Sequence, residues 1–200
     1  GMVLAMGVTG SGKSAFVNLL KAGSGKVGKD LLSAPQQPQA VKLTFDRKPR
    51  RSVTVVDTPG FTDTQPADAT TLMEVLRYLS IQYTLEIPLK GILYFHPIHE
   101  PLKSNSATHD YLQMLPSLCK GPVALENVII VTTRWEEVAN RATGIRREQE
   151  LIDTYLGPML DKGATMMRFH GSAAEAQAMV SRLVSSDGSL ELDVQRELVD

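Results

Sequence analysis

The chain has 200 residues, of which 42% are hydrophobic and 22% charged, and this composition is typical of a globular domain rather than of a disordered, collagen-like or coiled-coil protein. Its 21 Lys and Arg against 22 Asp and Glu leave a net charge of −1, so nothing indicates a nucleic-acid partner or an anionic membrane surface. The single cysteine, Cys119, excludes an internal disulfide and favours a reducing, cytoplasmic location. No apolar run is long enough to predict a membrane span.

Apolar strand-like segments alternate with segments of helical periodicity along the chain. Strands are predicted at 2–6, 41–45, 53–56, 91–95, 128–132 and 165–169, and helices at 15–21, 66–83, 108–118, 148–160, 173–185 and 189–199. The helix at 148–160 should be ended by Pro158 or Gly163. A basic turn at 47–51 indicates that the second and third strands form a hairpin. The alternation predicts an α/β fold of three layers, with a six-stranded, mostly parallel sheet and one antiparallel edge strand.

The first strand leads into a phosphate-binding motif. Residues 7–14 read G-V-T-G-S-G-K-S, a full match to G-x-x-x-x-G-K-[ST] placed between a strand and a helix. Glycines let the backbone curl around phosphate groups, and the N–H groups at a helix start point toward the anion. Lys13 would place its charge on the terminal phosphates, and the Ser14 hydroxyl suits Mg²⁺. The predicted nucleotide-binding residues of this loop are Thr9, Gly10, Ser11, Gly12, Lys13, Ser14 and Ala15.

A second motif follows the third strand, which ends in D-T-P-G-F. Asp57 could hold Mg²⁺ through water, and the Gly60 N–H could contact a γ-phosphate. Alone, D-x-P-G is more often a plain turn, but a complete phosphate loop earlier in the chain reverses those odds. The predicted metal ligands are therefore Ser14 and Asp57.

These two motifs together resemble the translation-factor-related (TRAFAC) class of P-loop GTPases. Within that class they look most like the immunity-associated, septin and chloroplast-import-receptor branch, including its fungal G-domain proteins, and the stretches 91–96 and 127–135 add to the likeness. The resemblance covers residues 2–185 and implies one G domain over 1–200. It also implies Mg²⁺-dependent binding and hydrolysis of GTP, with Lys13, Ser14, Asp57 and Gly60 as catalytic residues, and a nucleotide-dependent homodimer.

Guanine recognition in that class uses an [NT]-K-x-D motif after the fifth strand, where this chain reads T-R-W-E. The resemblance places Thr133, Arg134 and Glu136 at the base, with Arg134 replacing a lysine and Glu136 carrying one methylene more than aspartate. Trp135 could be a stacking platform or a packing residue. Alternatively, the acidic residues at 136 and 137 simply open a helix.

A second base-contacting loop follows the sixth strand in the class, and His170-Gly171-Ser172 occupies that place here. Backbone N–H groups of Gly171 and Ser172 could meet the base carbonyl. Ser172 is equally suited to cap the following helix.

Two further positions depart from the class pattern. Pro35 lies near the expected switch threonine, for which Ser33 could substitute. Phe61 stands where related enzymes keep a water-positioning glutamine, so hydrolysis would need another residue. Candidates within the chain are Thr62, Asp63, Gln65 and His96, and an arginine or histidine from a second copy is a candidate in trans.

Two alternative functions therefore stay open. The altered base motif would also suit an ATPase, or an adenylate-kinase-like phosphotransferase that uses ATP and ADP. The missing glutamine and switch threonine would suit a non-hydrolysing module that assembles with partners when it holds nucleotide.

Overall fold

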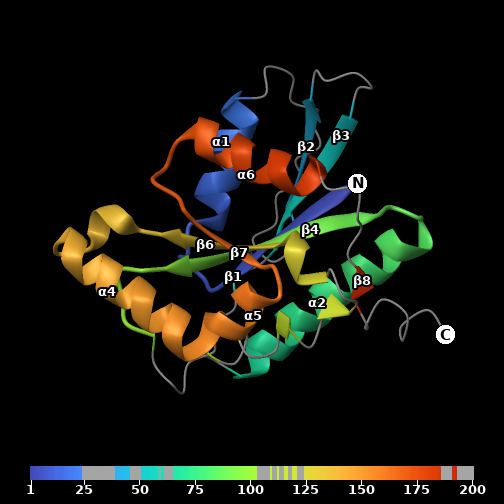
Figure 1. Ribbon diagram of the computed structural model, residues 1–200. Coiled ribbons are helices and arrows are strands. Elements are labelled where there is room, and N and C mark those ends of the chain that lie inside the picture. The colour runs from blue at the N-terminus through green and yellow to red at the C-terminus, as the bar shows by residue number, and fades with distance from the viewer. Residues whose placement is uncertain are drawn as a thin grey trace.

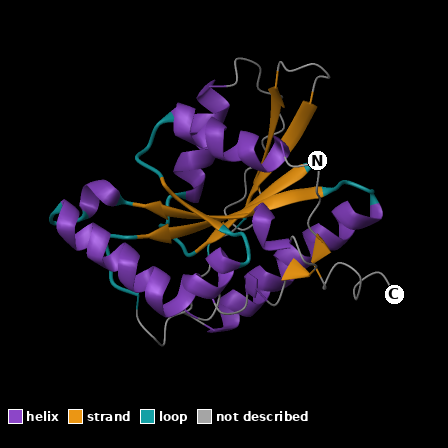
Figure 2. Ribbon diagram, viewed as in Figure 1, coloured by secondary structure: helices purple, strands orange, loops and turns teal. Residues whose placement is uncertain are grey.

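The computed structural model describes residues 1–23, 39–45, 51–58, 60, 65–102, 109, 112, 115–116, 119–120, 124–185 and 191–192. Figures 1 and 2 show a central sheet with helices on both of its faces. The sheet has six strands in the order β2-β3-β1-β4-β6-β7. β2 pairs with β3 in antiparallel fashion, and every other neighbouring pair is parallel. The predicted three-layer architecture with one antiparallel edge strand is therefore confirmed.

The strands of the main sheet are β1 (Met2–Gly7), β2 (Gln39–Phe45), β3 (Arg51–Asp57), β4 (Leu89–Pro97), β6 (Val128–Thr133) and β7 (Thr165–Arg168). A second, two-stranded sheet pairs β5 (Cys119–Lys120) with β8 (Glu191–Leu192). The helices are α1 (Lys13–Gly23), α2 (Gln65–Thr84), α4 (Arg141–Leu151), a π-helix (Ile152–Leu156), α5 (Gly157–Asp161) and α6 (Ala173–Ser185). Short 3₁₀ helices span Ala124–Asn127 and Trp135–Glu137.

Each face of the sheet carries its own hydrophobic core, because side chains alternate along a strand. In β1, Val3 and Ala5 face the layer of α1 and α6, which lie next to each other above the sheet in Figure 1. Leu4 and Met6 face the opposite layer, which contains α2, α4 and α5. The central strands read as unbroken apolar runs because they are buried on both faces.

The helical segment predicted at 148–160 begins earlier in the structure than expected, and of its two predicted ends, Pro158 and Gly163, the second is confirmed. It begins earlier, at Arg141, because the Asn140 side chain caps it by accepting a hydrogen bond from the Thr143 N–H at 2.9 Å. Pro158 does not end it, because the proline lies in the first turn of α5, where a missing N–H costs little. The chain leaves the helix at Gly163, whose φ of +99° favours glycine.

The helix predicted at 189–199 is wrong where the structure describes it. Glu191 and Leu192 form strand β8 and pair with Lys120 and Cys119 of β5. The other residues of that segment lie outside the described part of the chain. The described residues of the predicted helix at 108–118, namely 109, 112, 115 and 116, are helical.

The parallel strands all point the same way, so their carboxyl ends gather at one edge of the sheet. Gly7, Asp57, Pro97, Thr133 and Arg168 are the last residues of β1, β3, β4, β6 and β7. In open α/β sheets ligands bind at this edge. The described motif residues Gly7, Asp57 and Thr133 therefore lie at this one edge.

Candidate functional site

The loop between β1 and α1 is folded around its glycines. Gly10 and Gly12 have φ of +79° and +93°, a backbone conformation that side chains with a Cβ rarely adopt. The Phe16 N–H donates to the Gly12 carbonyl at 3.0 Å, so the helix begins within the loop. The loop thus presents a helix N-terminus at the carboxyl edge of the sheet, which is a favourable place for an anion.

Lys13 folds back into this loop. Its ammonium donates to the carbonyls of Gly7 and Val8, both at 2.9 Å, and lies 3.5 Å from the Ser11 hydroxyl. The residue is only 5% exposed, and this burial lowers the pKa of Lys13 to about 8 even though Asp57 acts to raise it. The loop therefore holds a buried cation at its centre.

Ser14 and Asp57 face each other across the start of the helix. The Ser14 hydroxyl donates to Asp57 Oδ2 at 2.7 Å. Burial raises the pKa of Asp57, while the Ser14 hydroxyl and the Lys13 charge act to lower it. Among the described residues, Asp57 Oδ1 is buried and accepts no hydrogen bond. A hydroxyl and an unsatisfied carboxylate oxygen form a donor set that Mg²⁺ prefers, so the pair fits this ion.

The segment after β3 lies against the loop. The Thr58 hydroxyl donates to the Ala5 carbonyl at 2.8 Å, which fixes the exit from the strand. A Cβ on Gly60 would come within 2.6 Å of the Thr9 Cα. Gly60 therefore lies directly over the phosphate loop, and only a residue without a side chain fits there.

The T-R-W-E turn is tied to the same loop from the other side. The Thr133 hydroxyl donates to the Ser11 carbonyl at 2.7 Å, and the Arg134 guanidinium donates to the Gly10 carbonyl at 3.2 Å from Nε and 3.0 Å from Nη2. Arg134 adopts a left-handed backbone conformation with φ of +60°. The predicted base motif and the phosphate loop are thus one connected site.

Glu137 is a site residue that the sequence did not single out. Its carboxylate pairs with Arg134 Nη1 and lies 3.7 Å from His99 Nε2. The spacing of three residues from Arg134 is a signal that could have suggested this pair. Glu137 holds the arginine whose other nitrogens contact the loop.

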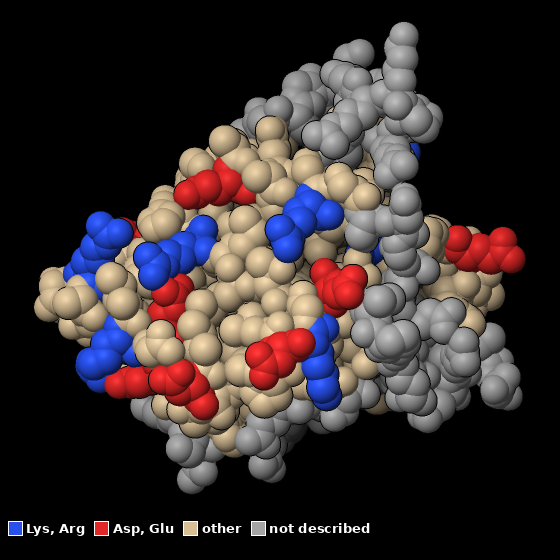
Figure 3. Space-filling model, in the orientation of Figure 1, with Lys and Arg blue, Asp and Glu red and all other residues tan. Residues whose placement is uncertain are grey.

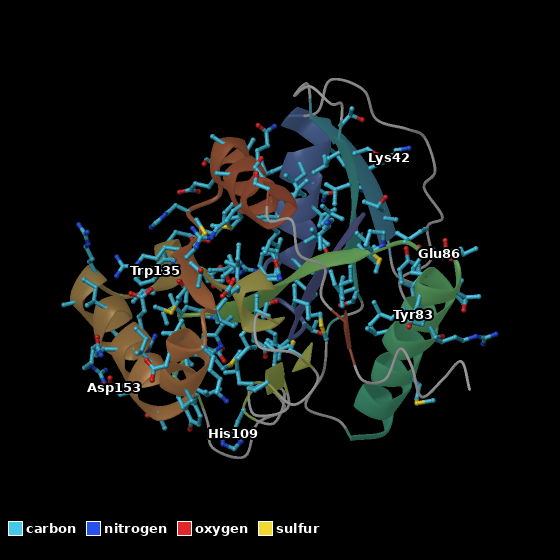
Figure 4. The ribbon with its side chains drawn as sticks, turned by 45° about the vertical axis from the view of Figure 1, so that its right-hand side comes forward. Lys42, Tyr83, Glu86, His109, Trp135 and Asp153 are labelled. Atoms are coloured by element: carbon cyan, nitrogen blue, oxygen red, sulfur yellow. The ribbon has the colours of Figure 1, made fainter. Side chains whose placement is uncertain are left out.

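Trp135 is a packing residue rather than an open platform. Its ring N–H points to the Thr132 carbonyl and hydroxyl, each at 3.2 Å, and its six-membered ring lies where a Cβ on Gly144 would come within 2.8 Å. The Arg168 guanidinium lies over the ring, with its carbon 4.6 Å from the ring centroid. Figure 4 shows Trp135 beside the α4 layer, at the end of the sheet.

Glu136 is exposed and lines an open hollow of about 530 Å³. The hollow is formed by Trp135, Glu136, Arg141, Arg168 and His170, which come from the T-R-W-E turn, the start of α4 and the end of β7. The residue pair Arg134–Gly10 connects this turn to the phosphate loop. The hollow is therefore the candidate place for a nucleobase whose phosphates lie in the loop.

The loop after β7 is capped by Glu175. Its carboxylate accepts from the N–H groups of His170 and Ser172 at 3.1 and 3.2 Å, and the Ser172 hydroxyl accepts from the Glu175 N–H at 3.2 Å. Burial acts to raise the pKa of Glu175, but these hydrogen bonds together lower it. The arrangement is a capping box for α6, so Ser172 is a helix cap, and its own N–H is taken.

The candidates for assisting hydrolysis are only partly described. His96 ends up at the edge of β4, only 3% exposed, and burial together with His99 lowers its pKa to about 4. Gln65 is the first residue of α2. The predictions that rest on Ser33, Pro35, Phe61, Thr62 and Asp63 lie outside the described residues.

Charge on the molecular surface is mixed. On the face shown in Figure 3, acidic and basic side chains are interspersed, and neither sign forms a continuous field. No helix in the described part of the chain combines the length and apolar character needed to cross a bilayer. Over the same residues, no group of three or more His, Cys, Asp or Glu side chains is placed to hold a metal.

The chain was compared with known proteins by sequence and by structure. No family model and no curated protein matches its sequence. Toc33 from Arabidopsis thaliana in complex with GDP and Mg²⁺ has a similar structure, with a TM-score of 0.69 and 14% identity over 96% of this chain and 87% of that one. An Era variant from Aquifex aeolicus bound to GDP and AlF₄⁻ matches with a TM-score of 0.61 and 14% identity over 97% and 62%. A probable GTP-binding protein, EngB, matches with a TM-score of 0.54 and 12% identity over 98% and 99%. These likenesses show the G-domain fold of P-loop GTPases.

Proposed function

We propose that this protein is a Mg²⁺-dependent GTP-binding protein that hydrolyses GTP. The observation that carries the proposal is the connection of two motifs: Arg134 and Thr133 of the T-R-W-E turn bind carbonyls of the same loop that encloses Lys13. A proposed phosphate site and a proposed base site that are tied together by these contacts suit the two ends of one nucleotide.

At the phosphate end, the loop supplies charge and N–H groups. Lys13 exchanges its contacts with the Gly7 and Val8 carbonyls for β- and γ-phosphate oxygens. The helix start at Gly12 adds the positive end of its dipole. Gly60, in contact with Thr9, is placed to sense a γ-phosphate through its N–H.

Mg²⁺ would be held by the Ser14 hydroxyl and, through water, by the Asp57 carboxylate, whose Oδ1 has no partner among the described residues. When bound, the ion would supply charge neutralisation at the phosphates. Ser14 already donates to Asp57, so the two ligands are oriented toward each other in the free protein. The structurally similar Toc33 is found in complex with GDP and Mg²⁺, which supports this expectation.

At the base end, Arg134 covers one side of the site and Glu136 supplies a carboxylate. Guanine carries two N–H donors on one edge, and a carboxylate is an acceptor-only group that suits them. Adenine has no donor at the equivalent ring nitrogen. Glu136 is therefore the residue proposed to select guanine.

The hydrolytic step needs a group that orients the attacking water or stabilises the charge that develops on the phosphates. Dimerisation is important for the GTPase activity of the chloroplast translocon components atToc33 and psToc159, whose structure resembles that of this chain. We propose that a second copy of this chain likewise completes the site when nucleotide is bound. Turnover per protein molecule would then rise with protein concentration.

One observation favours a second candidate, nucleotide binding with relaxed base selectivity. The Ser172 N–H, which by sequence could equally meet the base carbonyl or belong to a helix cap, donates to Glu175. Guanine would then lose one of its distinguishing contacts, and ATP could compete with GTP. This candidate keeps the whole phosphate end unchanged.

Calorimetric titration of the protein with GDP, GTP, ADP and ATP, with and without Mg²⁺, tests both candidates. The proposal expects Mg²⁺-dependent binding, with guanine nucleotides bound at least about tenfold more tightly than adenine nucleotides, the equivalent of one good hydrogen bond to a charged group. Equal affinities would favour the second candidate. Absence of binding by any nucleotide would contradict both, and phosphate release at several protein concentrations tests hydrolysis separately.

A further inference from the structure

We infer that Arg168 is a positioning residue for base selection. Glu148 holds Arg168 on the face of Trp135, and Trp135 in turn keeps Glu136, which follows it in the chain, in place in the hollow. The inference rests on the proposed function, because it assigns Glu136 the selection of guanine. Neither Arg168 nor Glu148 belongs to a motif, and nothing in the sequence marks them.

The ion pair between Arg168 and Glu148 is two-pronged. Arg168 Nε lies 3.1 Å from each carboxylate oxygen of Glu148, and Nη2 donates to Oε2 as well. Glu148 is 6% exposed, so its charge is compensated by this one arginine rather than by solvent. The pairing, together with its charge, raises the pKa of Arg168 above its usual value. The guanidinium is therefore fixed in position and permanently charged.

The edge of this guanidinium pairs with Glu148, and one of its flat faces rests on the indole of Trp135. Its carbon lies 4.6 Å from the Trp135 ring centroid, which is the distance of a cation–π contact. Trp135 is fixed on its other sides by the Thr132 carbonyl and by Gly144, which leaves no room for a Cβ. The Thr132 hydroxyl also lies 3.4 Å from Glu148 Oε1. Trp135, Glu148 and Arg168, together with Thr132, thus form one unit that joins β6, α4 and β7 beneath the turn.

This unit bears on selectivity because of where Glu136 lies. Glu136 directly follows Trp135 in a 3₁₀ turn, and it lines the same hollow as Arg168 and His170. An arginine released from Glu148 would be free to pair with Glu136 and to neutralise the acceptor that guanine requires. Glu148 thus has two effects: it orients Arg168 over Trp135, and it keeps Arg168 away from Glu136.

The test uses Arg168→Lys, which keeps the charge but loses the planar, two-pronged contact and the stacking. The double variant Glu148→Gln/Arg168→Met removes both charges together, so no buried charge is left unpaired and folding should be retained. The matched control is Arg146→Ala, which breaks an exposed pair with Glu150 on the same helix, α4. Dissociation constants for GDP, IDP and ADP are measured by calorimetry for each protein.

We expect the preference for GDP over ADP, and for GDP over IDP, to fall by about tenfold in both variants, as for the loss of one charge-assisted hydrogen bond. Affinity for ADP should stay within about twofold, because the phosphate loop is untouched. The Arg146→Ala control should keep the full preference. If the role of Arg168 were purely structural, the variants would instead have a lower melting temperature and would bind GDP, IDP and ADP more weakly to the same extent.

Two results overturn the inference in distinguishable ways. If the unmodified protein does not prefer GDP over ADP, the assignment of Glu136 and this inference fail together. If it does prefer GDP and both variants keep that preference, the inference alone fails and the proposed function stands.

Discussion

The proposed phosphate end and the proposed base end of the site are built in different ways. At the phosphate end, residues 7–14 form a continuous loop in which backbone carbonyls and a helix start enclose Lys13. At the base end, the turn around Trp135 is held by side chains from β6, α4 and β7, which are far apart in the chain. One end is local in sequence, and the other is assembled by the fold.

This difference indicates how each end responds to change. A local loop depends on a few glycines and one cation, so a single substitution should remove its function. An assembled turn spreads its support over several contacts, so individual losses should be smaller and should affect selectivity more than binding. Substitutions at the phosphate end should therefore have larger effects than substitutions at the base end.

Replacement of Lys13 by Ala should have the largest effect. The loop loses the only cation that lies within it among the described residues, and kcat/KM for GTP should fall by about a hundredfold or more, as when a key charge-stabilising donor is removed. Phosphate release at saturating and limiting GTP measures the change. Lys162→Ala, which alters an exposed turn, is the matched control and should behave as the unmodified protein. Normal turnover by Lys13→Ala would contradict the assignment of the loop.

Glu136→Gln should have the next largest effect, on selectivity. The amide loses the negative charge and offers a donor where guanine also has donors, so the preference for GDP over ADP should fall by about ten- to a hundredfold. Glu136→Asp, which shortens the side chain by one methylene, should retain the preference. Competition binding with a fluorescent guanine nucleotide compares the variants. Loss of affinity for ADP in Glu136→Gln would show that the residue serves the phosphate end instead.

The lowered pKa of Lys13 predicts opposite effects of pH on nucleotide affinity and on the free energy of unfolding. Its folded-state pKa is about 8, so above that pH it loses the charge that phosphate requires, and affinity should fall by up to about tenfold per pH unit. The unfolded chain keeps this proton up to its ordinary pKa of 10.5, so the unfolded state binds more protons in that window. The free energy of unfolding should therefore rise from pH 8 to 10.5.

Calorimetric affinities and urea unfolding across that pH range measure the two trends. The Lys13→Met variant provides the reference, because subtracting its profile removes every other titrating group. If nucleotide affinity and the free energy of unfolding, after this subtraction, change in the same direction with rising pH, Lys13 does not titrate as the burial of its ammonium predicts.

Glu137→Gln should have the smallest effect. Its pair with Arg134 is partly exposed, with side chains 40% and 37% accessible, and such pairs contribute little. Arg134 keeps its two contacts with the Gly10 carbonyl, so the preference for guanine should fall by no more than about threefold. Tryptophan fluorescence during GDP titration can detect this change through the neighbouring Trp135. A larger loss would mean that the base end also depends on one critical residue.

Much of the fold could be predicted because the signals are periodic and local. The apolar runs at 91–95 and 128–132 predicted central strands, and β4 and β6 are buried along nearly their whole length. The basic turn predicted a hairpin, and β2 pairs with β3 in antiparallel register. The alternation of strands and helices then left few topologies open, since parallel strands require crossover helices.

The errors occurred where local signals competed with tertiary contacts. Pro158 and Gly163 were the two candidate ends of a helix, and the chain passes Pro158, which lies in the first turn of α5 after a π-helix, and leaves the helix at Gly163. The amphipathic pattern at 189–199 predicted a helix, but Glu191 and Leu192 pair with β5. By sequence, Ser172 suits a base contact and a helix cap equally, and only the placement of Glu175 shows that it is a cap.

The proposed phosphate end can be predicted from the sequence alone, because eight consecutive residues carry the glycines, the cation and the hydroxyl that this chemistry needs. The way in which the proposed base end is held becomes visible only in the fold. Trp135 lies 13 residues before Glu148 and 33 before Arg168, yet the three side chains form one packed unit that joins the turn after β6 to α4 and β7. Their partnership has no fixed spacing, because it arises from the order of strands in the sheet and from the helix that crosses between them.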